Sequence, residues 1–199
     1  MRRDLPSAMA QLLLNLLFLL VLSATAVAGA AETRDAASFF SLNTGDLKSE
    51  LADARSESKK ALLVMFEQEG CPGCLHMKRN VLNRKDVQDF YRANFVNLSL
   101  DIWGSVPIRD FTRRELSEKA FAQATNVKGT PTFVFYDLDG NELVRILGTV
   151  ETPDEFLLLG QFVASGAYKT RSFAQYKREK PQKPNKTSFV TPSRQAALR

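Results

Sequence analysis

Histidine and cysteine are scarce in this chain of 199 residues, which has one histidine and two cysteines. Structural zinc sites usually take four ligands of these types, and copper sites take two or three soft ones. On a helix, His76 would lie about 140° around the axis from Cys71, with its ring pointing away from that sulfur. We therefore expect no metal site, and we expect His76 to face solvent.

Acidic residues are nearly absent from the C-terminal segment 168–199, which is rich in lysine, arginine and proline. A segment of this composition buries little apolar surface, so we expect one short helix and then a basic, partly disordered tail. The whole chain carries a formal net charge of +5. A basic excess of this size does not by itself name a partner, and we expect no nucleic acid among the partners.

A long apolar run occurs at the N-terminus. Residues 1–30 predict a signal peptide, because Arg2 and Arg3 precede the apolar run Leu12–Leu22, and Ala28-Gly29-Ala30 forms a small-residue site with cleavage after Ala30. An uncleaved anchor is the alternative, since the stretch 8–31 matches the roughly 20 residues that span a bilayer. Either way the rest of the chain leaves the cytoplasm, and we expect it in the periplasm, where disulfides form.

The part between the leader and the tail predicts one domain, residues 46–167, after a flexible lead-in at residues 31–45. Apolar runs predict strands at 61–66 and 95–102, and a hairpin turning at 138–141. Periodicity and capping patterns predict helices at 46–58, 72–82, 86–93, 117–127 and 153–165, with a loop at 103–114. This order predicts an α/β three-layer sandwich, with a mixed central sheet and helices on both faces.

Both cysteines fall at the junction of the first strand and the following helix, in the stretch EGCPGCLHMK. Two residues between cysteines make one helical turn, which brings the sulfurs close enough to bond. The first cysteine lies at the helix N-terminus, where unpaired backbone N–H groups and the helix dipole favour a thiolate. We therefore expect Cys71 to be the attacking thiol and Cys74 the resolving one. Pro72 suits the first helical turn.

A structural disulfide and a copper site are the two other interpretations of this pair. A purely structural disulfide across a four-residue loop removes little entropy from the unfolded chain, so it is a poor staple. A copper site would need a further histidine near the sulfurs, and the chain has only His76.

Thr130-Pro131 precedes the predicted hairpin, about sixty residues after the cysteine pair. A proline is tolerated at the start of a strand, and a cis bond there would turn the chain sharply and expose the Thr130 backbone. An extended partner segment could then pair with that backbone near the sulfurs. We expect Thr130 and Pro131, together with Pro72 and Gly73, to contact the substrate.

From about Asp46 to Ser165 the chain resembles the thioredoxin family, and within it the exported, SoxW-like thioredoxins of bacterial sulfur-oxidation systems. The stretches MFEQEGCPGC, LDIWG, GTPTFVFYDLDG and FVASGAYK carry this likeness. The resemblance implies a thioredoxin-like fold, a reversible Cys71–Cys74 disulfide and a cis Thr130–Pro131 bond. It also implies electrons drawn from a CcdA-type membrane thiol transporter, and a role in keeping sulfur-carrier or cytochrome-maturation thiols reduced.

The chain departs from the family pattern near the dithiol. Thioredoxins usually carry a buried aspartate where this chain has Met65, so the usual proton acceptor for Cys74 is missing. Glu67 shares a strand face with Met65 and is the preferred substitute over Glu69, although both could be surface charges. The tryptophan that usually precedes the dithiol is Gly70 here, and Trp103 lies too far along the chain to replace it on sequence grounds.

These patterns favour an exported disulfide reductase acting on disulfide-bearing periplasmic proteins, as a monomer and with no cofactor besides the redox-active cysteine pair. A periplasmic oxidant or isomerase is the alternative, since the two differ in which redox form is stabilised. A copper chaperone on the same fold is the alternative from another class.

Overall fold

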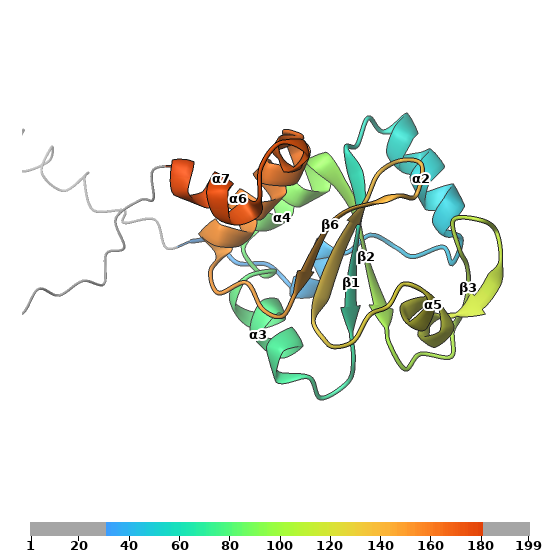
Figure 1. The fold of residues 1–199 in the computed structure, drawn as a ribbon. Coiled ribbons are helices and arrows are strands. Elements are labelled where there is room, and N and C mark those ends of the chain that lie inside the picture. Colours follow the sequence, from blue (N-terminus) through green and yellow to red (C-terminus); the bar gives the residue numbers. More distant parts are fainter. Residues whose placement is uncertain (1–30, 181–199) are drawn as a thin grey trace, which may run out of the picture. The chain divides into compact units, whose positions relative to one another are not determined.

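A mixed four-stranded sheet forms the centre of the protein, with strand order β2-β1-β5-β6 and helices on both faces (Figure 1). The structure, a computed structural model, describes residues 31–180. In chain order the elements are η1 (Ala36–Phe39), α2 (Leu47–Ser56), β1 (Ala61–Glu67), α3 (Pro72–Asn80), α4 (Lys85–Asn94), β2 (Phe95–Asp101), β3 (Pro107–Arg109), β4 (Glu115–Ser117), α5 (Glu118–Ala124), β5 (Thr132–Tyr136), β6 (Glu142–Leu147), α6 (Pro153–Ala164), η2 (Ala167–Lys169) and α7 (Phe173–Glu179). The predicted α/β sandwich with a mixed sheet is confirmed.

Strand β1 is a central strand of the sheet and is apolar on both faces, as its unbroken run ALLVMF predicted. It runs parallel to β2 and antiparallel to β5, and β5 runs antiparallel to β6. Leu63 and Met65 belong to the core on one face, and Val64 and Phe66 belong to the core on the other. Full burial of each such side chain contributes about 1.5–3 kcal/mol, so this strand fixes the position of the loop that follows it.

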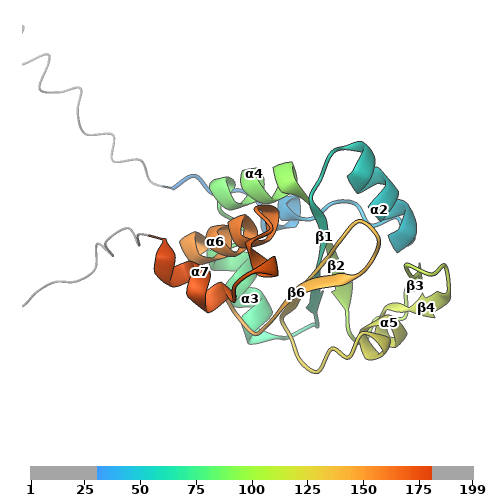
Figure 2. The same ribbon diagram turned by 45° about the horizontal axis from the view of Figure 1, so that its top comes forward.

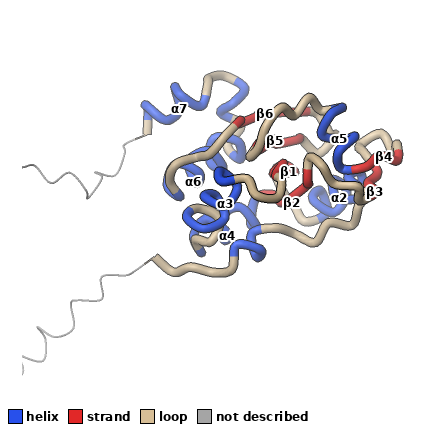
Figure 3. The backbone as a smooth tube through the Cα atoms, turned by 90° about the horizontal axis from the view of Figure 1, so that it is seen from below, coloured by secondary structure: helices blue, strands red, loops and turns tan. Residues whose placement is uncertain are grey.

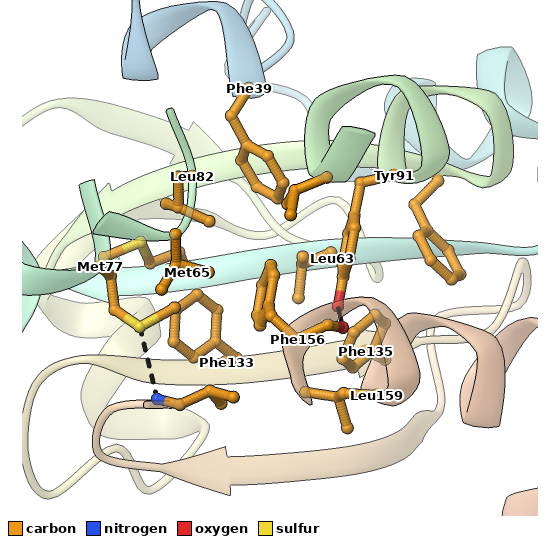
Figure 4. Close-up of a cluster of buried hydrophobic side chains, with 14 of the residues drawn as sticks. Phe39, Leu63, Met65, Met77, Leu82, Tyr91, Phe133, Phe135, Phe156 and Leu159 are labelled. Atoms are coloured by element: carbon orange, nitrogen blue, oxygen red, sulfur yellow. Dashed lines mark hydrogen bonds between the residues drawn. The ribbon is translucent and has the colours of Figure 1, made fainter. Parts of the chain in front are cut away.

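Helices α3, α4 and α6 cover one face of the sheet, and α2 and α5 cover the other (Figures 1 and 2). The core under α4 and α6 is built from aromatic rings, among them Tyr91 and Phe156, which stack with ring centroids 4.4 Å apart (Figure 4). The Tyr91 hydroxyl donates to the Phe156 carbonyl at 2.7 Å. Burial raises the pKa of Tyr91 well above its ordinary value, so the ring stays neutral.

Part of the segment predicted as a flexible lead-in belongs to the folded core. Residues 36–39 form the 3-10 helix η1, and the Phe39 ring is fully buried against Tyr91. The Gln88 side-chain amide donates to the Asp35 carbonyl at 2.8 Å, and the Ser41 N–H donates to the Asn97 carbonyl at 2.7 Å. The periodicity of the sequence begins only at Leu47, which is why the packing of this short turn was not foreseen.

The stretch 103–114, predicted as a loop, contains β3 and leads into β4, and the two form a small antiparallel hairpin. That prediction was wrong because strands of three residues are too short to show periodicity. Asp110 organises the hairpin tip by accepting hydrogen bonds from the backbone and side chains of Thr112 and Arg114. Burial opposes ionisation of Asp110, but these hydrogen bonds hold its pKa below the ordinary value.

The helix ends follow the capping pattern of the sequence. The hydroxyls of Ser117 and Thr152 cap α5 and α6 by accepting from backbone N–H groups three residues on. Gly166 adopts a left-handed conformation, φ 74°, just after α6, where a side chain would be strained. The short helix expected in the basic C-terminal segment is α7, whose Tyr176 packs on Phe162.

The predicted signal peptide, all but the last residue of the alternative anchor stretch 8–31, and the end of the tail lie outside the described residues, in segments 1–30 and 181–199. Among residues 31–180, no helix has both the length and the hydropathy needed to cross a bilayer.

Candidate functional site

The carboxyl ends of β1 and β2 lie at one edge of the sheet, where α3 begins, as the view from below shows (Figure 3). A cavity of about 330 Å³ opens there. It is lined by Glu67, Gln68, Glu69, Gly70, Cys71, Cys74, Leu75, Lys78 and Asp101. Both cysteines and the predicted proton acceptor Glu67 therefore border the same cavity.

Cys71 is the N-cap residue of α3, and its Sγ accepts a hydrogen bond from the Cys74 backbone N–H at 3.1 Å. Pro72 occupies the first helical turn, where its missing N–H leaves no hydrogen bond unmade. The two cysteines form a disulfide, with Cα atoms 5.3 Å apart. Cys71 is 5% exposed and Cys74 is 2% exposed. The N–H that contacts Cys71 in the disulfide is the group that would stabilise its thiolate after reduction.

The Thr130–Pro131 bond is cis, as the resemblance implied, and Pro131 lies directly against the start of α3. A Cβ added to Gly73 would lie 2.9 Å from the Pro131 ring and 3.1 Å from the Thr149 methyl group. The Pro131 carbonyl accepts from the Gly148 N–H at 2.8 Å, so the loop after β6 supports this turn. Thr149 thus lies beside Gly73 and Pro131 at the start of α3, a position that no sequence pattern indicates.

Glu67 is the last residue of β1, on the face of the sheet that carries Met65 and the dithiol. Its carboxylate lies 2.5 Å from the Lys78 ammonium group of α3 and accepts from the Ser99 hydroxyl of β2. The Glu67 side chain is 18% exposed. Met65 is fully buried and does not line the cavity. Glu67, two residues further along β1, does line it.

Trp103 comes to the site through tertiary structure. Its indole Nε1–H donates to the Gln68 side-chain oxygen at 3.0 Å, and its backbone N–H donates to the Asp101 carboxylate at 2.9 Å. The Gln68 carbonyl in turn accepts from the Cys71 N–H at 3.4 Å. The Lys119 ammonium group lies 5.1 Å from the centre of the indole ring. Its distance along the sequence argues against a role for this residue, but the fold bonds it to Gln68, which lies two residues before Gly70.

Glu118 is a further acidic group at this edge and is 8% exposed. Burial raises the pKa of the Glu118 carboxyl; the Asp101 N–H lowers it, and the Asp101 carboxylate raises it further. A Cβ on Gly104 would lie 1.9 Å from a Glu118 carboxylate oxygen. Glycine at position 104 therefore lets the turn after β2 close over this carboxyl group.

His76 is half-buried on α3, and not fully solvent-facing as predicted. Its Nδ1 lies 3.1 Å from the Asn80 amide nitrogen, and its Nε2 is buried without a hydrogen-bond partner in the described part of the chain. Within residues 31–180, no group of three or more histidine, cysteine, aspartate or glutamate side chains is arranged to hold a metal ion.

A mixed sheet of this order, with a Cys-x-x-Cys disulfide opening a helix beside a cis-proline, defines a protein of thioredoxin fold. The chain belongs to the family of thioredoxin-like domains, which matches residues 47–164. No curated protein sequence matches it.

Two solved structures agree with this fold. One is a thioredoxin-fold protein from Helicobacter pylori, with 22% sequence identity and a TM-score of 0.57 over 72% of this chain and 88% of that one. The other is a putative disulphide-isomerase from Bacteroides thetaiotaomicron, with 19% identity and a TM-score of 0.50 over 72% of this chain and all of that one (100%). At sequence identities this low, the likeness shows a shared fold and no more.

Proposed function

We propose that the protein is an exported thiol–disulfide oxidoreductase that reduces disulfides on periplasmic partner proteins. The observation that carries this proposal is the position of Cys71: its sulfur caps the N-terminus of α3 and is bonded to a second cysteine one turn along. A helix N-terminus favours a thiolate, and the thiolate is the attacking species in disulfide exchange.

The reaction follows from this geometry in two displacements. The Cys71 thiolate attacks one sulfur of the partner disulfide, forms a mixed disulfide, and releases the first partner sulfur as a thiolate. Cys74 then gives up its proton and attacks the Cys71 sulfur, which releases the second partner thiolate and restores the Cys71–Cys74 disulfide. Two electrons pass to the partner in each cycle.

We assign the proton of Cys74 to Glu67. The Glu67 carboxylate and Cys74 line the same cavity, and Lys78 and Ser99 hold that carboxylate in place. A positioned carboxylate within reach of a thiol, directly or through one water, acts as a general base. In this role Glu67 takes the place of the buried aspartate that is Met65 in this chain.

Partner binding uses the other side of the dithiol. The turn at Thr130 and Pro131 borders the start of α3, and the backbone of Thr130 can pair with an extended segment that carries the target disulfide. Pro72 is exposed and Gly73 packs against Pro131, so both lie where such a segment would pass.

The proposed direction is reduction, and the charges near the site support it. Glu67, Glu69 and Asp101 line the cavity with one ammonium group, that of Lys78, which is paired with Glu67. Carboxylates are therefore in excess, and they oppose a thiolate at Cys71. A strong oxidant needs a strongly stabilised thiolate, so this surrounding favours a reductant over an oxidant or isomerase. The SoxW-like resemblance adds the partners: sulfur-carrier or cytochrome-maturation thiols, with electrons from a CcdA-type membrane transporter.

The equilibrium reduction potential of the pair tests this assignment. We expect a value near that of thioredoxin, about −270 mV, and a value near about −120 mV would instead support the oxidant. We also expect the purified protein to reduce insulin disulfides with dithiothreitol, and Cys71→Ala to abolish this activity. Cys74→Ala should trap mixed disulfides with partners in a periplasmic extract; finding no covalent adduct would argue against the exchange mechanism.

A further inference from the structure

Five large apolar side chains are exposed among residues 31–180: Leu42, Leu75, Trp103, Val106 and Leu147. Leu75 lines the cavity beside the dithiol, and Trp103 is hydrogen-bonded to Gln68 of that lining. Trp103 is the largest of them, with 62% of its surface exposed. An exposed tryptophan costs free energy in water unless something covers it, and tryptophan is enriched among the side chains that dominate protein interfaces. Trp103 is therefore suited to contact a partner protein.

Trp103 is exposed but held in place. Hydrogen bonds fix both its indole nitrogen and its backbone nitrogen, to Gln68 and Asp101, and the Gly104 N–H closes the turn onto the Asp101 carbonyl at 2.9 Å. The Lys119 ammonium group contacts its ring. A side chain ordered in this way loses little entropy on binding, which is the property of an anchor residue.

The partners of Trp103 link it to the dithiol. Gln68 and Asp101 both line the cavity that contains Cys71 and Cys74, and Leu75, 44% exposed, lines it from α3. Trp103 and Leu75 thus present apolar surface beside one opening. A side chain next to the reacting cysteine of a partner would meet this surface while its disulfide reaches Cys71.

The charges at the opening indicate what else the partner carries. Three carboxylates and one ammonium group line the cavity, although the chain as a whole has a formal charge of +5. The ammonium group of Lys78 is paired with Glu67, whereas Glu69 and Asp101 have no ion-pair partner within residues 31–180. Carboxylates without an ion-pair partner attract a basic group on an arriving segment and raise the rate at which that segment associates.

We propose that Trp103 is a specificity-determining residue, and that it selects polypeptide disulfides whose reacting cysteine is flanked by an apolar and a basic side chain. The inference rests on the proposed function, since it assigns the substrate class of the same dithiol. The apolar side chain packs between Trp103 and Leu75, and the basic one faces Glu69 and Asp101.

The test uses the full chain, reduced beforehand, and three disulfides that release 2-thiopyridone on attack. Two are peptides that carry a 2-pyridyl disulfide on cysteine next to leucine, one with a flanking lysine and one with a flanking glutamate. The third is 2,2′-dithiodipyridine, which has no side chains to recognise. Each is followed by absorbance in a single turnover, so that the ratio of a peptide rate constant to the dithiodipyridine rate constant measures recognition.

We expect Trp103→Ala to lower the ratio for the lysine peptide about tenfold, the loss typical of a tryptophan anchor. Trp103→Phe keeps the apolar ring but loses the hydrogen bond to Gln68, and it should recover part of that ratio. Leu42→Ala, which truncates an exposed apolar residue (89% exposed) that does not line the cavity, should leave the ratio unchanged. Equal slowing of the peptide and dithiodipyridine by Trp103→Ala would show a positioning role and refute the proposal.

The charge part is tested with the two peptides. The wild-type protein should react about two- to fivefold faster with the lysine peptide, and salt near 0.5 M should reduce this preference. Glu69→Gln should weaken it, whereas the matched change Glu57→Gln, next to the opposite end of β1, should not. Equal rates for both peptides at low salt would overturn the inference. A protein that reduces none of the three disulfides would refute the proposed function instead.

Discussion

Glu67→Gln separates the chemistry of the site from its stability. The change removes the carboxylate charge but keeps an oxygen that accepts from Ser99. It also loses the ion pair with Lys78. The Lys78 side chain is 36% exposed and the Glu67 side chain 18%, and an ion pair at such a half-exposed position contributes about 0.5–1 kcal/mol. Because domains of this kind are stable by about 5–15 kcal/mol, the variant should remain folded.

The effect on rate should be larger. A positioned general base contributes about 10²–10⁴-fold, and the cavity of about 330 Å³ leaves room for water to take over part of this role. We therefore expect the lower end, about a hundredfold loss in the resolving step at neutral pH. The loss should shrink as the pH rises, because a thiol then ionises with less help from a base.

Dithiodipyridine resolves the two steps in one experiment. Attack by Cys71 releases the first equivalent of thiopyridone, and displacement by Cys74 releases the second, so Cys74→Ala should give only the first. Glu67→Gln should slow the second phase and leave the first nearly unchanged, with Glu57→Gln as the charge-matched control. Lys78→Met keeps the carboxylate and should slow the second phase less than tenfold. Equal slowing of both phases, or of neither, in Glu67→Gln would refute the assignment of Glu67 as the proton acceptor.

Four further changes test the packing and the electrostatics of the fold by urea denaturation. Tyr91→Phe leaves the Phe156 carbonyl without its buried donor and should cost about 1–2 kcal/mol; no loss would mean that this hydrogen bond is dispensable. Gly160→Ala gains about 1 kcal/mol of helix propensity. Its Cβ, however, would lie 2.7 Å from the Phe90 ring and 3.0 Å from the Tyr91 ring, and overpacking of this kind costs about 1–3 kcal/mol. The free energy of unfolding should therefore fall. Asp110→Asn should cost about 1–2 kcal/mol at pH 7, and the difference should fade as the pH drops below about 4, because the pKa of Asp110 is lowered and its charged form stabilises the fold only above that range. Glu118→Gln should stabilise by about 0.5–1 kcal/mol at neutral pH and by nothing below about pH 4, because a raised acid pKa makes the charged form unfavourable in the folded state.

The parts of the site that could be predicted are those encoded by neighbouring residues. The spacing of Cys71 and Cys74, with a proline between them, defines the helix start, and the turn residues at 138–141 define the hairpin of β5 and β6. The sheet face on which Glu67 lies was also predictable, because side chains alternate between the two faces along a strand and this rule is local.

The parts that could not be predicted depend on residues far apart in the chain. The hydrogen bond between Trp103 and Gln68 joins positions 35 residues apart, and the contact of Thr149 with Gly73 requires the loop after β6 to return to α3. The β3–β4 hairpin has strands too short for a periodic signal, and its shape depends on the hydrogen bonds of Asp110. These contacts join separate segments, so the sequence of one segment alone does not predict them.

The burial of Phe39 sets a practical rule for anyone who prepares a shortened protein. A fragment cut to the family match, residues 47–164, would discard this ring together with Tyr176 and expose the surfaces that both cover. Removal of a buried phenylalanine side chain typically costs about 3–5 kcal/mol, a large share of the stability of a small domain. Recombinant work should therefore retain residues 34–180, so that a loss of activity in a trimmed protein is not mistaken for a defect in its thiol chemistry.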